Sequence, residues 1–176
     1  GIRLLDLSAK VVFPKRFNAM LDEEDNKSTA LSNTTLQLVA EKLEQLEGDA
    51  PVEILCDKHG GRDYYQPLLM MHLAGGLPQT LQEGREISRY RIEGERTLDI
   101  SFRMKAESLM PVALSSMLAK YLRELAMVSL NKFWAERIEG LKPTAGYPVD
   151  AKRFLAEISG EVEKLGIPRD DFWRKK

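Results

Sequence analysis

The spacing of apolar residues changes its period along this chain, and that change restricts the fold more than any other feature of the sequence. Residues 98–105 alternate between apolar and polar side chains, which is the period of a half-buried β-strand. Residues 28–46 instead place apolar side chains along one face of a helix. Because segments of the two kinds follow one another, the sequence predicts an α/β fold with a mixed sheet flanked by helices.

The same periods recur in the rest of the chain. We expect further strands at residues 5–13, 52–56 and 86–93, and further helices at 63–73, at 111–136 and from residue 150 onward. The helix at 111–136 is apolar nearly all round, so we expect it to be largely buried. No repeat or clear linker interrupts the 176 residues. We therefore interpret residues 1–176 as a single domain.

Composition excludes several classes of protein. With 43% hydrophobic and 30% charged residues the chain is typical of a globular protein rather than a disordered one. No apolar run approaches the ~20 residues of a membrane helix, and the net charge of −1 excludes a global basic field. Residues 85–105 are rich in basic side chains, which predicts either a local phosphate-binding surface or a solvated strand face.

The cysteine and histidine content predicts a protein of a reducing compartment and argues against a zinc site in this chain. The lone cysteine, Cys56, excludes an internal disulfide, and its apolar neighbours favour a buried structural thiol. One cysteine and two histidines are few for a zinc site. The first residues lack the layout of a signal peptide. These features predict a cytoplasmic protein.

The apolar run at 52–56 ends in Asp57, and Lys58, His59, two glycines and Arg62 follow at once. In open α/β sheets, binding sites gather beyond the carboxyl ends of strands, so Asp57 is a candidate metal ligand. Lys58 and Arg62 are candidate phosphate contacts from a loop that its glycines make flexible. A carboxylate at a strand end also commonly forms a turn. The residues alone leave both interpretations open, and His59 is equally compatible with either.

A second candidate group lies on the long helix. Ser116, Lys120 and Glu124 share one stripe by the i, i+4 rule, beside Arg123. Charges in an otherwise apolar helix are costly unless they are paired or face a cleft, so a Lys120–Glu124 surface pair and a binding site are both possible. Tyr147, between Gly and Pro in a loop, is either a flat face for a base or sugar or a ring folded onto the core.

Together these motifs resemble one known family. The segment SSMLAKYLRE (115–124) resembles the ASILAKVTRD helix motif of ribonuclease HII, the type 2 ribonuclease H family, with Glu124 where the family has Asp. Downstream, AGYPVDAKRFL is similar to the family's KGYGTKEHL and places Tyr147 on its tyrosine. Upstream, VEILCD is similar to the VLVDG strand, with Asp57 as the terminal carboxylate. The motifs occur in the family's order from about residue 28 onward.

The resemblance implies a ribonuclease H-like mixed sheet and metal-dependent hydrolysis of the RNA strand of RNA·DNA hybrids or of duplexes with embedded ribonucleotides. In that family four carboxylates hold Mg²⁺ or Mn²⁺, which clamp the scissile phosphate. Matching this sequence to the family's motifs implies that Asp57 is the third of these acids and Glu124 the fourth. Substrate contacts are expected from Lys58, Arg62, Ser116, Lys120, Arg123 and Tyr147.

Two departures from the family pattern keep other hypotheses open. The family's first two acids lie in an N-terminal DEAGRG strand that nothing in this chain matches, so we expect an N-terminally truncated fold or a divergent branch. Glu for Asp at position 124 adds one methylene to the fourth acid. The leading hypothesis is a ribonuclease HII-like endonuclease or a fragment of one. The alternatives are a noncatalytic nucleic-acid-binding domain of the same fold and an unrelated α/β scaffold.

Overall fold

The computed structural model describes residues 2–24 and 26–175 and divides them into two compact units. Unit 1 takes in the described residues of Gly1–Lys10 and Ala19–Ser116, and unit 2 those of Val11–Asn18 and Met117–Lys176. Each unit has its own cluster of buried hydrophobic side chains. The interpretation of residues 1–176 as a single domain stays a prediction.

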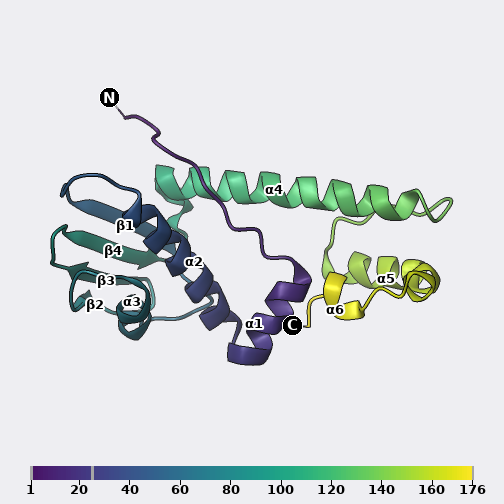
Figure 1. Cartoon of the computed structure of the whole chain (residues 1–176), viewed down its shortest axis with the longest axis horizontal. Coiled ribbons are helices and arrows are strands. Elements are labelled where there is room, and N and C mark those ends of the chain that lie inside the picture. Colours follow the sequence, from purple (N-terminus) through teal and green to yellow (C-terminus); the bar gives the residue numbers. More distant parts are fainter. Residues whose placement is uncertain (1, 25, 176) are drawn as a thin grey trace. The chain divides into compact units, whose positions relative to one another are not determined.

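Helices and strands alternate along the chain (Figure 1). Their order is α1 (Pro14–Glu24), α2 (Lys27–Glu44), β1 (Val52–Asp57), α3 (Gln66–His72), β2 (Gln79–Gln82), β3 (Ile87–Ile92), β4 (Leu98–Arg103), the 3₁₀ turn η1 (Ala106–Ser108), α4 (Met110–Ala135), α5 (Pro148–Leu165) and α6 (Arg169–Phe172). The predicted segments at 28–46, 52–56, 86–93, 98–105, 111–136 and from 150 onward are confirmed as α2, β1, β3, β4, α4 and α5, within a few residues at their ends.

The strands form one mixed sheet in unit 1, in the order β1-β4-β3-β2. β1 runs parallel to β4, whereas β3 is antiparallel to both of its neighbours. The α/β class with a mixed sheet flanked by helices is thereby confirmed, and the arrangement is consistent with a ribonuclease H-like α/β fold. β2 was not expected from the sequence. All four residues of its sequence QTLQ are exposed, so the strand has no buried face that an apolar pattern could have revealed.

Helices α2 and α3 pack on the same face of this sheet. Leu36 of α2 and Leu69 of α3 are fully buried in one cluster with Phe102 of β4. The Tyr65 ring stacks on Phe102 with 3.6 Å between ring centres. Since burial removes these large apolar side chains from water, this cluster is the main source of hydrophobic stabilisation in unit 1.

The strand expected at residues 5–13 is wrong. The described residues before Pro14 form no helix or strand, and α1 begins at that proline, whose fixed φ suits a first helical turn. The alternating leucines are largely exposed and no strand lies beside them, so the pattern has no sheet face on which to be buried. Ion pairs of Asp6 with Lys42 and of Lys10 with Glu41 join this segment to α2 instead.

Unit 2 consists of helices around a smaller core. Trp134 of α4 packs with Phe154 and Ile158 of α5. Asn18 is buried, and its side-chain amide donates to the backbone oxygens of Asp170 and Trp173 while its Oδ1 accepts from the Lys175 amide. Through these three hydrogen bonds the C-terminal segment is held against the first turns of α1.

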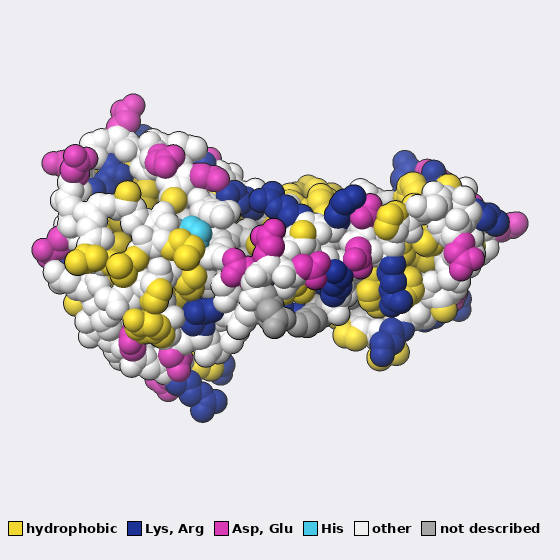
Figure 2. Space-filling model, turned by 60° about the horizontal axis from the view of Figure 1, so that its bottom comes forward, with side chains coloured by type: hydrophobic (Ala, Val, Ile, Leu, Met, Phe, Trp, Pro, Cys, Tyr) yellow, Lys and Arg dark blue, Asp and Glu magenta, His cyan; other side chains and the backbone are white. Residues whose placement is uncertain are grey.

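The expectation that α4 is largely buried is wrong. Within the described helix only Val112 and Trp134 are buried, and Met117, Tyr121 and Val128 are among its exposed apolar side chains. The apolar side chains of α4 project from nearly all sides of the helix, but the other described elements pack against only part of its circumference. Figure 2 shows hydrophobic side chains exposed among mixed acidic and basic ones on the visible face.

We predict that Leu36→Ala lowers the free energy of unfolding by ~2–5 kcal/mol, because it opens a cavity between α2 and the sheet. Leu31→Ala on the same helix is the matched control, since Leu31 is 48% exposed and Leu36 is 0% exposed. Its cost should stay below about 1 kcal/mol. Urea-induced unfolding followed by circular dichroism measures both values. Equal losses would contradict the placement of α2 on the sheet.

Candidate functional site

Asp57 is the last residue of β1 and lies at the carboxyl end of the parallel pair that β1 forms with β4. Its Oδ1 accepts a hydrogen bond of 3.0 Å from the Ala106 amide. Lys105, just before, has φ 56°, and this left-handed backbone lies between β4 and the η1 turn that carries that amide. The Asp57 side chain is exposed and has no ion-pair partner in residues 2–24 and 26–175. Asp57 therefore stabilises a turn and also presents a carboxylate to solvent.

Several polar residues share the face of the sheet that carries Asp57, and three of them lie near it. Arg103 is its register partner on β4, Ser101 lies two residues earlier, and Arg89 of β3 is opposite Ser101. Ser101 Oγ and Arg103 Nε are buried without a hydrogen-bond partner in the described part of the chain. Sequence reasoning did not single out these residues, although the polar positions of the 98–105 alternation were the signal that could have found them.

Lys58 is used by the fold. Its side chain is only 4% exposed, and Nζ donates to Gly84 O at 2.6 Å, Asp63 Oδ1 at 2.7 Å, and Ser88 Oγ and Arg62 O at 3.1 Å. An ammonium has three protons to donate, so these four acceptors share its whole capacity. Lys58 joins the turn after β1 to β3 and to the loop before β3, so its ammonium is taken up by the fold and is not free to contact phosphate.

His59 and Arg62 connect the same turn to α2. His59 Nδ1 lies 2.9 Å from Ser32 Oγ, and the ring packs edge-on against Tyr65 and Phe102. Burial, together with the charge of Arg62, lowers the pKa of His59 to about 4, so the imidazole is neutral at pH 7. For His59 the structural-turn interpretation is therefore the one that the contacts support.

The two glycines of this turn have a conformational task rather than the expected flexibility. Gly60 and Gly61 have φ of 59° and 75°, a region that residues with a Cβ rarely adopt. Arg62 donates from Nη2 to Thr29 Oγ1 at 2.8 Å and from Nε to Ser28 Oγ at 3.3 Å, in the first turn of α2. The loop is thus held at both ends.

Three of the predicted site residues meet in unit 2. Arg123 Nη1 donates to Glu124 Oε1 at 2.7 Å, and Nη2 donates to Ala145 O at 2.5 Å. The guanidinium carbon lies 5.6 Å from the centre of the Tyr147 ring, within the range of a cation–π contact. Tyr147 is 67% exposed, so its ring is not folded onto the core. We call Arg123, Glu124 and Tyr147 the Arg–Tyr cluster.

The loop that carries Tyr147 is fixed to α4 and α5 by polar contacts that sequence reasoning missed. Asn131 of α4 makes two 2.8 Å hydrogen bonds to the backbone of the buried Thr144. Asp150 accepts from Thr144 Oγ1 at 2.6 Å and from the Ala145 amide at 2.9 Å. Arg153 donates to the same carboxylate at 2.7 Å. The hydrogen bonds from Thr144, Arg153 and the Ala145 amide, in that order of effect, lower the pKa of Asp150 to about 2.

Lys120 and Ser116 lie on α4 but outside the Arg–Tyr cluster. The Lys120–Glu124 ion pair that the spacing allows is not among the described contacts, because Glu124 pairs with Arg123. Lys120 is exposed and has no ion-pair partner among the described residues, so its charge is available to an anion. Ser116 is half-buried and is the last residue of unit 1, whereas Lys120 belongs to unit 2.

The two predicted metal ligands belong to different units, Asp57 to unit 1 and Glu124 to unit 2. No group of three or more His, Cys, Asp or Glu side chains that could hold a metal ion occurs in residues 2–24 and 26–175. Each acid also has one oxygen in a contact with the protein itself. These residues do not make a metal centre within either unit, and we derive no catalytic step through a metal.

Comparison with protein-family models, with curated proteins and with solved structures returned no match to this chain. In the described ranges no helix combines the length and the apolar composition needed to cross a bilayer.

We predict that Lys58→Met lowers the free energy of unfolding by ~1–3 kcal/mol, because it leaves the buried Ser88 Oγ and the half-buried Gly84 oxygen without the Lys58 donor. Lys120→Met is the matched control and should change stability by less than about 0.5 kcal/mol. Chemical denaturation measures both. If Lys58→Met proved neutral, the Lys58 contacts would not hold the turn and its role as a ligand contact would be open again.

We also predict an acid-sensitive core at His59. The folded-state pKa is about 4 and the ordinary value is 6.5, so the unfolded state binds the proton first as the pH falls. The free energy of unfolding should fall between pH 6.5 and 4, by up to about 3 kcal/mol, and His59→Asn should remove most of that pH dependence. NMR titration of the two histidines, assigned with His72→Asn, checks the midpoint directly. A His59 midpoint near 6.5 would contradict its burial.

Proposed function

We propose that this chain belongs to a ribonuclease HII-like endonuclease that hydrolyses the RNA strand of RNA·DNA hybrids with Mg²⁺ or Mn²⁺. The observation that carries the proposal is the Arg–Tyr cluster. The resemblance to that family rests on separate segments, and two of them, LAKYLRE and AGYP, are brought into contact by Arg123, Ala145 and Tyr147. A chance likeness of two short motifs gives no reason to expect that contact.

The chemistry of the Arg–Tyr cluster suits a nucleic-acid backbone. An exposed tyrosine ring stacks on a sugar or base irrespective of sequence, and a neighbouring guanidinium adds a contact to phosphate. Lys120 lies one turn before Glu124 on α4 and contributes an exposed positive charge that no described residue pairs with. We propose that Tyr147 packs on the ribose at the junction between RNA and DNA, with Arg123 and Lys120 on phosphates.

Asp57 and Glu124 are the proposed metal-binding carboxylates. Asp57 is exposed beyond a strand that has a parallel neighbour, which is where sites gather in open α/β sheets. The outer edge of β1 pairs with no other strand in the described part of the chain.

A second candidate function is noncatalytic binding of hybrids through the same cluster. The 2.7 Å ion pair between Arg123 and Glu124 favours it, because a guanidinium already neutralises the carboxylate that a metal would need. In this case Asp57 only stabilises the η1 turn, and the Arg–Tyr cluster is a binding surface.

Hybrid binding tests the part that both functions share. We predict that Tyr147→Ala weakens binding of a fluorescein-labelled RNA·DNA hybrid by about tenfold in fluorescence anisotropy, because one stacking contact is lost. Tyr121→Ala is the matched control, since Tyr121 is a comparably exposed tyrosine of α4 outside the cluster. It should leave the affinity within about twofold. No binding by the unmodified chain, or equal losses in both variants, would overturn the proposed surface.

Cleavage separates the two functions. With Mg²⁺ or Mn²⁺, Asp57→Asn and Glu124→Gln should each reduce hybrid cleavage by at least about 100-fold while binding persists, because each removes a metal ligand. Glu53→Gln is the control, since Glu53 is an exposed acid on the same strand and the same face as Asp57. Binding without cleavage by the unmodified chain would select the noncatalytic function.

A further inference from the structure

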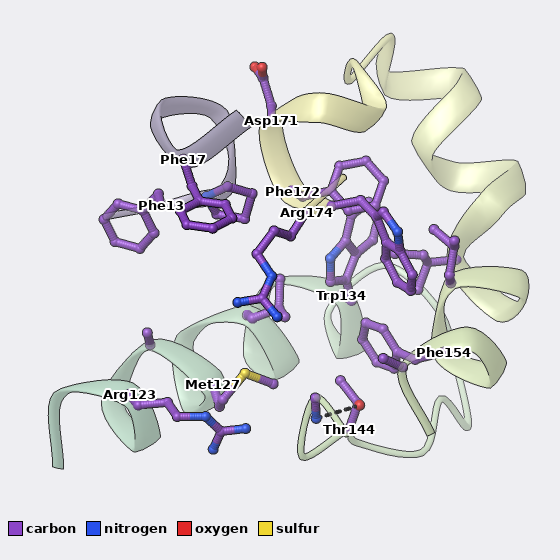
Figure 3. Close-up of a pocket in the computed structure, with 18 of the residues that line it drawn as sticks. Phe13, Phe17, Arg123, Met127, Trp134, Thr144, Phe154, Asp171, Phe172 and Arg174 are labelled. Carbon is purple, nitrogen blue, oxygen red and sulfur yellow. Dashed lines mark hydrogen bonds between the residues drawn. The ribbon is translucent and has the colours of Figure 1, made fainter. Parts of the chain in front are cut away.

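Unit 2 contains a cavity of about 750 Å³ that the proposed function does not use (Figure 3). This volume is in the range of small-molecule sites. Its wall is formed by the first residues of α1, by α4 and α5 and by the C-terminal segment. Six aromatic side chains line it: Phe13, Phe17, Trp134, Phe154, Phe172 and Trp173.

Two exposed cations and one buried N–H donor line the cavity without a protein acceptor in the described part of the chain. Arg174 extends into the space between Phe17 and Trp134 (Figure 3), and its only described contact is a cation–π contact with Phe17 at 5.4 Å. Lys152 of α5 has no ion-pair or hydrogen-bond partner among the described residues. Trp134 is 2% exposed, and its Nε1–H is buried without a partner in the same part of the chain.

The acceptors that line the cavity are already engaged. Asp171 is ion-paired with Lys15 at 3.2 Å. Thr144 Oγ1 donates to Asp150 and accepts from the Gly146 amide. Arg123, the third cation of the lining, is satisfied by Glu124 and Ala145. The exposed cations Arg174 and Lys152 and the buried Trp134 N–H therefore line an aromatic space whose described carboxylate, Asp171, is already ion-paired.

From this juxtaposition we infer that the cavity of unit 2 binds a small amphipathic anion, with an aromatic body between the rings and its carboxylate or phosphate group on Arg174 or Lys152. The aromatic body gains from ring contacts and from apolar burial. The anionic group replaces water as the acceptor for an exposed cation and forms charge-assisted hydrogen bonds with it. The inference does not rest on the proposed function.

The cavity is preformed rather than loosely closed. Asn18 is buried and binds the backbone on both sides of Phe172 and Arg174 through the three hydrogen bonds described above. On the opposite wall, Gly146 has φ 74°, and a Cβ there would meet Arg123 and Met127 at 3.4 Å. A ligand would therefore enter without the cost of ordering these segments.

A pair of matched probes tests the inference: 1-naphthaleneacetate, which has a ring system and one carboxylate, and 2-(1-naphthyl)ethanol, which has the same ring system and no charge. Both tryptophans of the chain line the cavity, so quenching of tryptophan fluorescence reports occupancy and calorimetry gives the affinity. We expect the carboxylate to bind at least tenfold more tightly than the alcohol. Equal affinities, or no heat and no quenching with either probe, would overturn the inference.

Variants locate the anionic group. Arg174→Gln should weaken 1-naphthaleneacetate by about tenfold and leave the alcohol unchanged, and Lys152→Gln should act in the same direction. Arg169→Gln is the control, because Arg169 contacts the Trp173 ring but does not line the cavity. It should leave both affinities unchanged. Equal weakening by Arg174→Gln and Arg169→Gln would show general electrostatic attraction and would also overturn the inference. Thermal unfolding of each variant verifies that the fold is intact.

Discussion

The hydrogen bonds donated by the buried ammonium of Lys58 are the interaction on which the geometry of unit 1 depends. It lies directly after β1 and joins four acceptors from the following turn, the loop before β3 and β3 itself. A charge taken out of water is tolerated only when its hydrogen bonds are all made, so the turn has little freedom to rearrange. The position of Asp57, one residue earlier, follows from that constraint.

The two units contribute different kinds of candidate site. Unit 1 presents a carboxylate at a strand end, beside Ser101 and Arg103, whose polar atoms are buried without partners. Unit 2 presents an aromatic ring and a cation on one surface and an aromatic cavity with free cations nearby. Arg123 belongs to both features of unit 2, because it contacts Tyr147 and also lines the cavity. An anion in the cavity would therefore alter the electrostatic environment of the Arg–Tyr cluster, which couples the two proposals physically without making one depend on the other.

Periodicity was a good guide wherever a segment had a partner to pack against. The alternation at residues 98–105 predicted β4 because Leu98, Ile100 and Phe102 face α2 and α3. The same alternation at residues 5–13 predicted a strand wrongly, because no strand of the described residues lies beside it to give it a buried face. The long helix was placed well but its burial was not, since exposure depends on what surrounds α4 rather than on its own composition.

What the sequence by itself determined is the α/β class, most of the elements between α2 and α5, and the residue types at the candidate sites. Only the tertiary structure decided that Lys58, His59 and Arg62 make their contacts within the fold. It also decided that Arg123 and Tyr147, which are distant in sequence, contact each other. The reason is physical. Local patterns specify backbone conformation through sterics and side-chain period, whereas the partner of a charge or a ring lies elsewhere in the chain and is set by packing.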